Sequence, residues 1–127
     1  MEEELKILLV SPDLLSTSRI AGLARSLPAR VETLRSIDDE PRGGPYGLVL
    51  LDLQTIAGDP AVVVVRLRAL IDAQRAASGH AAQLIAFGPH VAKERLAEAQ
   101  AAGADAVVSR GELLGGFPTL VKRWLAP

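Results

Sequence analysis

Short, nearly continuous apolar runs alternate along this chain with longer segments of helical periodicity. The short runs are KILLV (6–10), LVLLDL (48–53), QLIAF (83–87) and AVV (106–108). Such runs are typical of strands that are buried on both faces of a parallel sheet. VETL (31–34) alternates polar and apolar residues instead, which favours a half-covered edge strand. The alternation of strands and helices predicts an α/β fold, with one doubly wound sheet of five parallel strands and helices on both faces.

Helix signals lie between these runs. Ser11 can cap a first helix, with Pro12 at its first position and Asp13 in its first turn, and this helix ends before Pro28. A second helix opens at Asp59-Pro60 and ends before Gly79. It includes VVVV (62–65), because the long helical pattern that follows outweighs the strand propensity of valine.

Two further helices complete the pattern. One spans about residues 91–102 and is closed by Gly103 as a left-handed cap. The other spans about residues 117–125 and presents Phe117, Leu120, Val121 and Trp124 on one stripe. Between the second and third strands, SIDDEPRGGPYG (36–47) contains two prolines and three glycines. These residues disfavour a helix, so we expect a loop or a single turn there.

Composition limits the classes of function. The 127 residues form one domain, 1–127, in which 49% of residues are hydrophobic and 23% are charged. A net charge of −1 and only four aromatic residues argue against binding of nucleic acid or of an anionic membrane surface. The acidic start MEEELKILLV has too short an apolar run for a signal peptide or a membrane span, so a cytoplasmic location is expected. The chain has no cysteine, which excludes disulfides and thiolate metal sites.

Polar residues follow several of the predicted strands. Asp52 ends the buried run LVLLD, and the residues that follow the other strands include Ser11, Gly88 and Ser109-Arg110. In open α/β sheets, function is located in the crevice beyond the carboxyl ends of the central strands. These residues are therefore the candidates for a functional site.

The chain resembles the receiver domain of two-component response regulators over essentially its whole length. LVLLDLQ (48–54) resembles the third strand with its phosphoacceptor, GADAVVSR (103–110) the turn into the fifth strand, and KILLVSPDLLSTSRI (6–20) the first strand and helix. The resemblance implies a flavodoxin-like sheet of strand order 2-1-3-4-5, here with the family's second helix shortened or missing. It also implies that Asp52 occupies the phosphoacceptor position.

Most of the other family residues are replaced. Ser11 and Pro12 stand where the family has two acidic metal ligands, and Asp13 lies one residue beyond that pair. Gly88 takes the place of the serine or threonine at the end of strand four. Arg110 takes the place of the lysine after strand five, and Val107 that of the switch aromatic. Because magnesium needs oxygen ligands and a carboxylate partner for Asp52 is missing, we expect no bound metal and no cofactor.

Asp52 has two interpretations. It is either a phosphoacceptor or a relic that is hydrogen-bonded to loop amides or paired with Arg110. The relic interpretation predicts a pseudo-receiver: a non-enzymatic signalling module that binds proteins without a working phosphorylation cycle. One alternative is an atypical receiver that still accepts phosphate at Asp52 with help from Arg110. The other is a small ligand-binding domain that uses the crevice of Ser11, Gly88-Pro89-His90 and Ser109.

The resemblance also implies protein partners, such as a histidine kinase or an output domain, and leaves a homodimer open. In receivers, a face made by the fourth helix, the fifth strand and the fifth helix meets partners. In this sequence that face corresponds to Lys93, Arg95, Glu98 and Trp124, although Trp124 on an apolar stripe is more typical of a core residue. No cluster of Asp, Glu or Cys joins His80 and His90 to complete a metal site, so both are expected to be loop residues.

Overall fold

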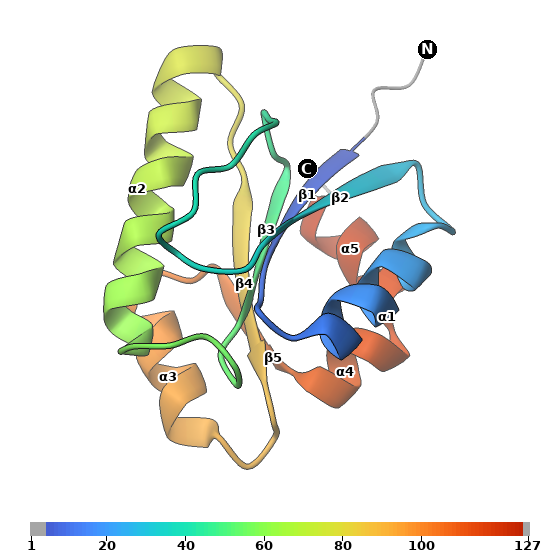
Figure 1. Cartoon of the computed structure of the whole chain (residues 1–127), viewed down its shortest axis with the longest axis vertical. Coiled ribbons are helices and arrows are strands. Elements are labelled where there is room, and N and C mark those ends of the chain that lie inside the picture. The colour runs from blue at the N-terminus through green and yellow to red at the C-terminus, as the bar shows by residue number, and fades with distance from the viewer. Residues whose placement is uncertain (1–4, 126–127) are drawn as a thin grey trace.

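In the computed structural model, which describes residues 5–125, helices cover both faces of an open sheet (Figure 1). The elements are β1 (Leu5–Val10), α1 (Leu14–Ala24), β2 (Ala29–Leu34), β3 (Leu48–Asp52), α2 (Pro60–Ser78), β4 (Gln83–Gly88), α3 (Lys93–Ala102), β5 (Ala106–Ser109), α4 (Arg110–Gly115) and α5 (Phe117–Leu125). All strand pairs are parallel, and the strand order is β2-β1-β3-β4-β5. The predicted α/β class and the strand order implied by the receiver resemblance are confirmed.

The central strands bury both of their faces because successive side chains point to opposite sides of the sheet. Leu9 and Leu50 belong to a cluster with Ile20 of α1 and Val121 of α5. The residues next to them in the strands, such as Leu51, belong to a second cluster that α2 covers. Figure 1 shows this division, with α1, α4 and α5 on one side of the sheet and α2 and α3 on the other. The continuous apolar runs of the sequence are thus explained.

The two outer strands are less buried than the three inner ones. β2 is an edge strand with intermediate or exposed residues up to Leu34, as its alternating sequence predicts. β5 is the other edge, and all four of its residues are only partly buried. AVV (106–108) does pack on both faces of the sheet, with Val107 against one core cluster and Ala106 and Val108 against the other, but it is only partly buried because its outer edge has no neighbouring strand.

The start of α1 differs from the prediction. Asp13, not Ser11, is the N-cap: its carboxylate accepts hydrogen bonds from the backbone N–H groups of Leu15 (3.2 Å) and Ser16 (3.3 Å). The helix therefore begins at Leu14, and Pro12 precedes it rather than occupying its first turn. The physical reason is that the Asp13 carboxylate accepts from the first free N–H groups of the helix, whereas the Ser11 hydroxyl donates to Asp52 and accepts from the N–H of Asp13, which precedes the helix.

The boundaries of α2 agree with the sequence signals. Asp59 caps the helix by accepting a hydrogen bond from the N–H of Ala61 (2.9 Å), and Pro60 lies in the first turn. Gly79 ends it with a φ of 78°, a conformation that a residue with a side chain rarely adopts. In α3 the positive φ of the cap residue Gly103 is also confirmed, but this helix begins at Lys93, two residues later than predicted.

No helix forms between β2 and β3, which confirms the prediction for residues 36–47. The carboxylate of Glu32 accepts hydrogen bonds from the N–H groups of Arg42 and Gly43 (2.8 Å each) and from the phenol of Tyr46 (2.7 Å). From α2, the amide side chain of Gln74 accepts from the N–H of Tyr46 (2.6 Å) and donates to its carbonyl (2.8 Å). Side chains of β2 and α2 thereby hold an irregular loop where the family has its second helix.

A short helix, α4, was not predicted. Ser109 caps it with a capping box, in which its hydroxyl accepts from the N–H of Glu112 and its own N–H donates to the Glu112 carboxylate (3.1 Å each). Gly116 then ends α4 immediately before α5, consistent with a cap role for the Gly115-Gly116 pair. Within residues 5–125, none of the helices combines the length and the apolar character that crossing a bilayer requires.

Candidate functional site

Asp52 lies at the carboxyl end of the central strand β3, and its relative exposure is 0%. Its carboxylate accepts three hydrogen bonds. The hydroxyls of Ser11 (2.7 Å) and Thr55 (2.8 Å) donate to Oδ2, and the backbone N–H of Gln54 (3.0 Å) donates to Oδ1. A buried carboxylate is tolerated when donors replace the water it has lost. Both oxygens of the Asp52 carboxylate are therefore hydrogen-bonded, and one of the three donors is a loop amide.

Ser11 and Pro12 occupy the positions of the missing acidic pair. Ser11 is completely buried, and besides donating to Asp52 its oxygen accepts a hydrogen bond from the N–H of Asp13 (3.2 Å). Pro12 offers only its backbone carbonyl, which accepts from Arg35 (3.4 Å). Neither side chain adds negative charge beside Asp52.

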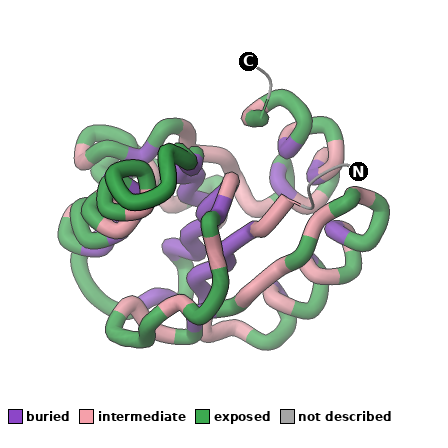
Figure 2. Tube along the Cα trace, turned by 90° about the horizontal axis from the view of Figure 1, so that it is seen from above, coloured by how far each residue is buried: buried purple, intermediate pink, exposed green. Residues whose placement is uncertain are grey.

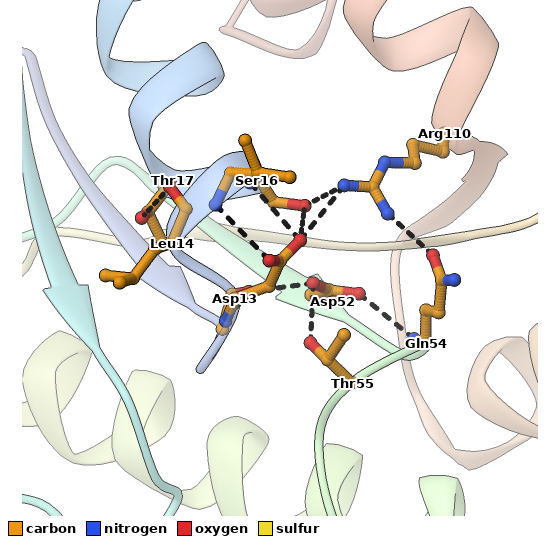
Figure 3. Close-up of polar contacts among 10 residues, drawn as sticks. Asp13, Leu14, Ser16, Thr17, Asp52, Gln54, Thr55 and Arg110 are labelled. Atoms are coloured by element: carbon orange, nitrogen blue, oxygen red, sulfur yellow. Dashed lines mark hydrogen bonds and ion pairs between the residues drawn. The ribbon is translucent and has the colours of Figure 1, made fainter.

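Asp13 is held away from Asp52 by its role in α1. Besides the two backbone N–H groups that it caps, it accepts hydrogen bonds from the hydroxyl of Ser16 (2.6 Å) and from the guanidinium of Arg110 (3.1 Å). The Ser16 hydroxyl, together with Arg110 and the helix N–H groups, outweighs partial burial and holds the pKa of the Asp13 carboxyl below its usual value. Asp13 is therefore an ionised helix cap within a hydrogen-bonded cluster (Figure 3).

Arg110, at the start of α4, links three segments that are distant in sequence. Its guanidinium donates to the side-chain oxygen of Gln54 in the β3–α2 loop (2.6 Å), and to Asp13 and the hydroxyl of Ser16 in α1. Figure 3 shows these contacts converging above Asp52. The alternative prediction, that Arg110 pairs with Asp52, was wrong, because Asp13 and Gln54 provide the nearer acceptors.

The remaining candidates, Gly88, His90 and Ser109, lie near the cluster of Asp13, Asp52 and Arg110 but make no side-chain hydrogen bond to these three residues within the described chain. Gly88 is the buried last residue of β4, paired in register with Ser109 of β5. A Cβ atom on Gly88 would meet Leu53 and Leu96 at ordinary contact distances of 3.7 and 3.8 Å, so space does not require glycine there. Ser109 is the cap of α4, which explains its hydroxyl structurally. His90 is exposed in the turn between β4 and α3.

The four residues of the expected partner face differ in exposure. Lys93 and Glu98 are exposed on α3. Arg95 is half-buried, and its guanidinium donates to the backbone carbonyl of Leu53 after β3 (3.0 Å). Its side chain therefore links α3 to the segment that follows β3. Trp124 is partly buried against the core cluster under α5, as expected for a residue on an apolar stripe.

The donor set does not fit the magnesium ion that receiver domains use. Mg²⁺ requires several oxygen ligands in near-octahedral geometry, usually with more than one anionic group among the protein and substrate. Here both oxygens of Asp52 already accept hydrogen bonds, and the adjacent positions are a serine and a proline. No group of three or more histidine or acidic residues able to hold a metal exists within the described part of the chain.

Sequence reasoning missed three members of the cluster, Ser16, Gln54 and Thr55. Gln54 and Thr55 lie two and three residues after Asp52, and an aspartate followed at this spacing by potential donors is a local turn signal that could have indicated them. Ser16 lies three residues after Asp13, at the spacing that an N-cap side chain reaches.

One surface hollow lies near the amino ends of the strands and is lined by Leu5, Lys6, Pro45, Tyr46, Gly47, His80 and Ala81. A larger one is lined by residues of β2 and of the loop after it: Glu32, Thr33, Leu34, Arg35, Asp39, Glu40, Pro41 and Arg42. Neither hollow is lined by Ser11, Gly88 or Ser109, so neither supports the ligand-binding alternative.

Comparison with known proteins gives a consistent answer for the fold. The chemotaxis response regulator CheY4 of Vibrio cholerae superposes with a TM-score of 0.75 at 13% identity, covering 97% of this chain and 100% of that one. The signal receiver domain of an HD domain-containing protein from Pseudomonas fluorescens Pf-5 superposes with a TM-score of 0.72 at 15% identity, covering 98% and 89%.

A third solved structure is an atypical orphan response regulator, described as having a phosphorylation-independent regulatory mechanism. It superposes with a TM-score of 0.69 at 13% identity, covering 95% of both chains. No family model and no curated protein matches the sequence. With its strand order and nearly complete coverage of these structures, this chain has the fold of the receiver domains of response regulators.

Proposed function

We propose that this chain is a pseudo-receiver: a single receiver-like domain over residues 1–127 that signals by binding proteins, without a metal-dependent cycle of aspartyl phosphorylation. One observation carries the proposal. Asp52, at the phosphoacceptor position, is completely buried and accepts hydrogen bonds from Ser11, Gln54 and Thr55. A phosphodonor would have to displace these donors to reach either carboxylate oxygen.

The chemistry of phosphoryl transfer supports the same conclusion. Transfer to a carboxylate brings two anions together, so catalysis depends on charge neutralisation and positioning. Ser11 and Pro12 provide no charge for a metal, and the guanidinium of Arg110 is bound to Asp13, Ser16 and Gln54. No residue of the described crevice is left to take over the bridging role of the metal.

The conformational switch of the family also lacks its parts. Gly88 has no hydroxyl that could reach toward a phosphate, and Val107 has no ring that could change its orientation. Signalling would then depend on a binding surface that does not change with phosphorylation. Its exposed charged residues on α3 include Lys93 and Glu98. The kind of partner proposed is a histidine kinase or an output domain in the cytoplasm. The non-enzymatic role and Asp52 as a vestigial phosphoacceptor are part of the same proposal.

Intact-mass spectrometry tests the proposal. The protein is incubated with acetyl phosphate and excess magnesium, beside an intact receiver domain as a positive control. We expect no acid-labile phosphate on this chain. As matched variants, Asp52→Asn removes the proposed relic, and Asp59→Asn changes an exposed aspartate that caps α2. A phosphate that is present on the wild type and on Asp59→Asn, but absent from Asp52→Asn, would establish the atypical active receiver instead.

A further inference from the structure

The outer edge of β2 carries backbone groups that point away from the sheet. β2 is an edge strand, and its neighbour is β1. At one end of this pair, the N–H of Leu5 donates to the carbonyl of Pro28 (2.9 Å). At the other end, the N–H of Ser11 donates to the carbonyl of Leu34 (2.9 Å). Because the backbone groups of successive residues in a strand point to opposite sides, β1 bonds the even-numbered residues of β2. The odd-numbered residues, which point outward, are Ala29, Val31 and Thr33.

No segment of the described chain pairs with this edge. Among the N–H and C=O groups of these three residues, only the N–H of Ala29 is hydrogen-bonded within residues 5–125, to the carbonyl of Leu27 (2.8 Å). The loop of residues 36–47 lies on the face of the sheet that α2 covers, and α1 lies on the other face (Figure 1). Figure 2 shows the buried colour concentrated in the middle of the molecule, whereas the residues of β2 before Leu34 are intermediate or exposed. An open edge strand of six residues without proline is a template on which another strand can pair.

A second copy of β2 can pair with this edge in the antiparallel direction. In an antiparallel pair, outward-pointing residues lie opposite each other and exchange backbone hydrogen bonds. With a twofold axis at Val31, the N–H of each Val31 donates to the carbonyl of the other. The N–H of each Thr33 donates to the carbonyl of Ala29 in the second copy. Both kinds of bond are made twice, and neither displaces a hydrogen bond within one chain.

The charged residues of β2 match in this register. Residues at equal distances from the axis lie opposite each other, so Arg30 of each copy faces Glu32 of the second copy. Both side chains point to the same face, since even-numbered residues of a strand share a face and the twofold axis is perpendicular to the sheet. The Cα atoms of such an opposed pair are about 4.5 Å apart. Two cross-strand ion pairs therefore form, one on each side of Val31.

Glu32 can take part in such a pair while it holds the loop. Its carboxylate accepts three hydrogen bonds from loop residues, the last of them from Tyr46, and a carboxylate has about four acceptor sites. Partial burial would raise the pKa of Glu32, but these hydrogen bonds outweigh it and hold the pKa below its usual value. Arg30 is exposed, and its guanidinium has several N–H donors, enough for more than one acceptor. The interchain pair therefore adds to the contacts of both side chains instead of replacing them.

Neighbouring registers lack this match. A twofold axis at residue 30 places the two Arg30 side chains opposite each other, and an axis at residue 32 does the same for the two Glu32 side chains. Like charges directly opposite each other destabilise a pair of strands. The charges therefore select the axis at Val31.

The chain has room for the second strand beside the loop. A hollow of about 720 Å³ lies between residues 32–35 and the loop residues 39–42. In the pairing about Val31, residues 27–30 of the second copy lie opposite residues 32–35, so its Arg30 enters this hollow. The charged lining consists of three acidic residues and two arginines: Glu32, Asp39, Glu40, Arg35 and Arg42. The entering guanidinium therefore meets a net negative charge. The loops of the two copies lie on either side of the axis, about 17 Å apart along the strands, and do not meet.

From the open edge, the matched charges and the hollow, we propose that β2 is a homodimerisation surface, on which a second copy of this chain adds its β2 antiparallel about a twofold axis at Val31. The sheets of the two copies then form one continuous sheet. A single pair of strands buries less than the roughly 1,200 Å² of a stable interface, so the dimer is weak, with a Kd on the order of 0.1 mM. The surface is separate from Asp52 and does not depend on the phosphorylation state.

Charge reversal tests the register. Sedimentation velocity from about 10 μM to about 1 mM should show reversible dimers of the wild type, as expected for the proposed affinity. Arg30→Glu or Glu32→Arg places like charges opposite each other at both ion pairs, so each variant alone should dimerise at least about tenfold more weakly. An equimolar mixture restores both pairs in a heterodimer and should regain the wild-type affinity. Lys93→Glu, on α3 beside the other edge of the sheet, changes the net charge as Arg30→Glu does and should leave the dimer unaffected.

Cysteine variants test the axis without changing Glu32, whose replacement also removes contacts of the loop. The chain has no cysteine of its own. Val31→Cys places two thiols opposite each other at the axis, with Cα atoms about 5.5 Å apart, within the range for a disulfide. Thr33→Cys, two residues along the same face and more exposed, places its Cα atoms about 14 Å apart. Under mild oxidation, Val31→Cys should therefore form a linked dimer at least about tenfold faster than Thr33→Cys.

Any of three results would overturn the proposal. The first is a wild type that stays monomeric up to about 1 mM, well above the proposed Kd. The second is a mixture of the two charge variants, both folded by circular dichroism, that fails to dimerise. The third is a Val31→Cys variant that oxidises no faster than Thr33→Cys.

Discussion

Removal of the Ser11 hydroxyl should destabilise the protein, although this residue lies at the position of a lost metal ligand. Ser11 has 0% exposure, and its hydroxyl donates to Oδ2 of Asp52 at 2.7 Å. In Ser11→Ala the carboxylate keeps the donors from Gln54 and Thr55, but water cannot replace the third one in a closed site. If Asp52 were a solvated reactive group, the same substitution would have almost no effect on stability.

The magnitude follows from the kind of bond that is lost. A hydrogen bond to a charged group contributes about 1.5–3 kcal/mol to the free energy of unfolding. For a chain of 127 residues, each kcal/mol corresponds to roughly 3–5 °C in Tm, between the values for smaller and larger domains. Ser11→Ala should therefore lower Tm by about 5–15 °C.

Urea denaturation followed by circular dichroism, with a double-mutant cycle, measures this effect. In the Asp52→Asn background the acceptor is neutral, so Ser11→Ala should cost about 1 kcal/mol less than in the wild type. Ser18→Ala, at an exposed position of α1, is the matched control and should change stability by less than about 0.5 kcal/mol. If Ser11→Ala resembled this control, or cost the same in both backgrounds, the structural role of Asp52 would be refuted.

Three further predictions concern the same site and the loop before β3. Isothermal titration near neutral pH should show no magnesium binding in the low-millimolar range, the order expected for a ligand-poor site, and saturable binding that is lost in Asp52→Ala would contradict this. Burial, aided by the hydrogen bond to Glu32, raises the pKa of Tyr46 to about 12, so this single tyrosine should show its phenolate absorbance near pH 12 and not near pH 10. Because the folded-state pKa is the higher one, the corresponding stability is present below pH 10 and is lost as the pH rises to 12, by about 2–3 kcal/mol, and Tyr46→Phe should lack this loss. Gln74→Ala removes the hydrogen bonds to both backbone groups of Tyr46 and to the carbonyl of His80, so hydrogen exchange at the Tyr46 amide should accelerate at least about tenfold, and unchanged protection would show that other contacts hold the loop.

Local patterns in the sequence were sufficient for most of the fold. Four apolar runs and the alternating segment VETL (31–34) predicted the five strands, and the start of α2 at Asp59-Pro60 and its end at Gly79 were also predicted correctly. These signals are local because the polarity of successive residues shows which faces of a strand are buried, and a helix cap acts within a single turn. The prolines and glycines of residues 36–47 likewise predicted the missing helix from their own backbone preferences. Asp52 could be placed at the end of a buried strand for the same reason.

The roles of the side chains in the site were decided by tertiary structure. Arg110 meets Asp13 across 97 positions of sequence and Gln54 across 56, and Ser11 meets Asp52 across 41. Each pairing depends on which strand ends become neighbours and on which acceptor is nearest when several are in reach. Ser11 has the local features of a helix cap, yet its hydroxyl donates to the buried carboxylate of Asp52, and the carboxylate of Asp13 accepts from the N–H groups that begin α1. The choice of one helix cap over another changes the free energy of unfolding by about 1 kcal/mol. A buried carboxylate without its hydrogen-bond donors lowers that free energy by several kcal/mol, so the tertiary contact determines the outcome.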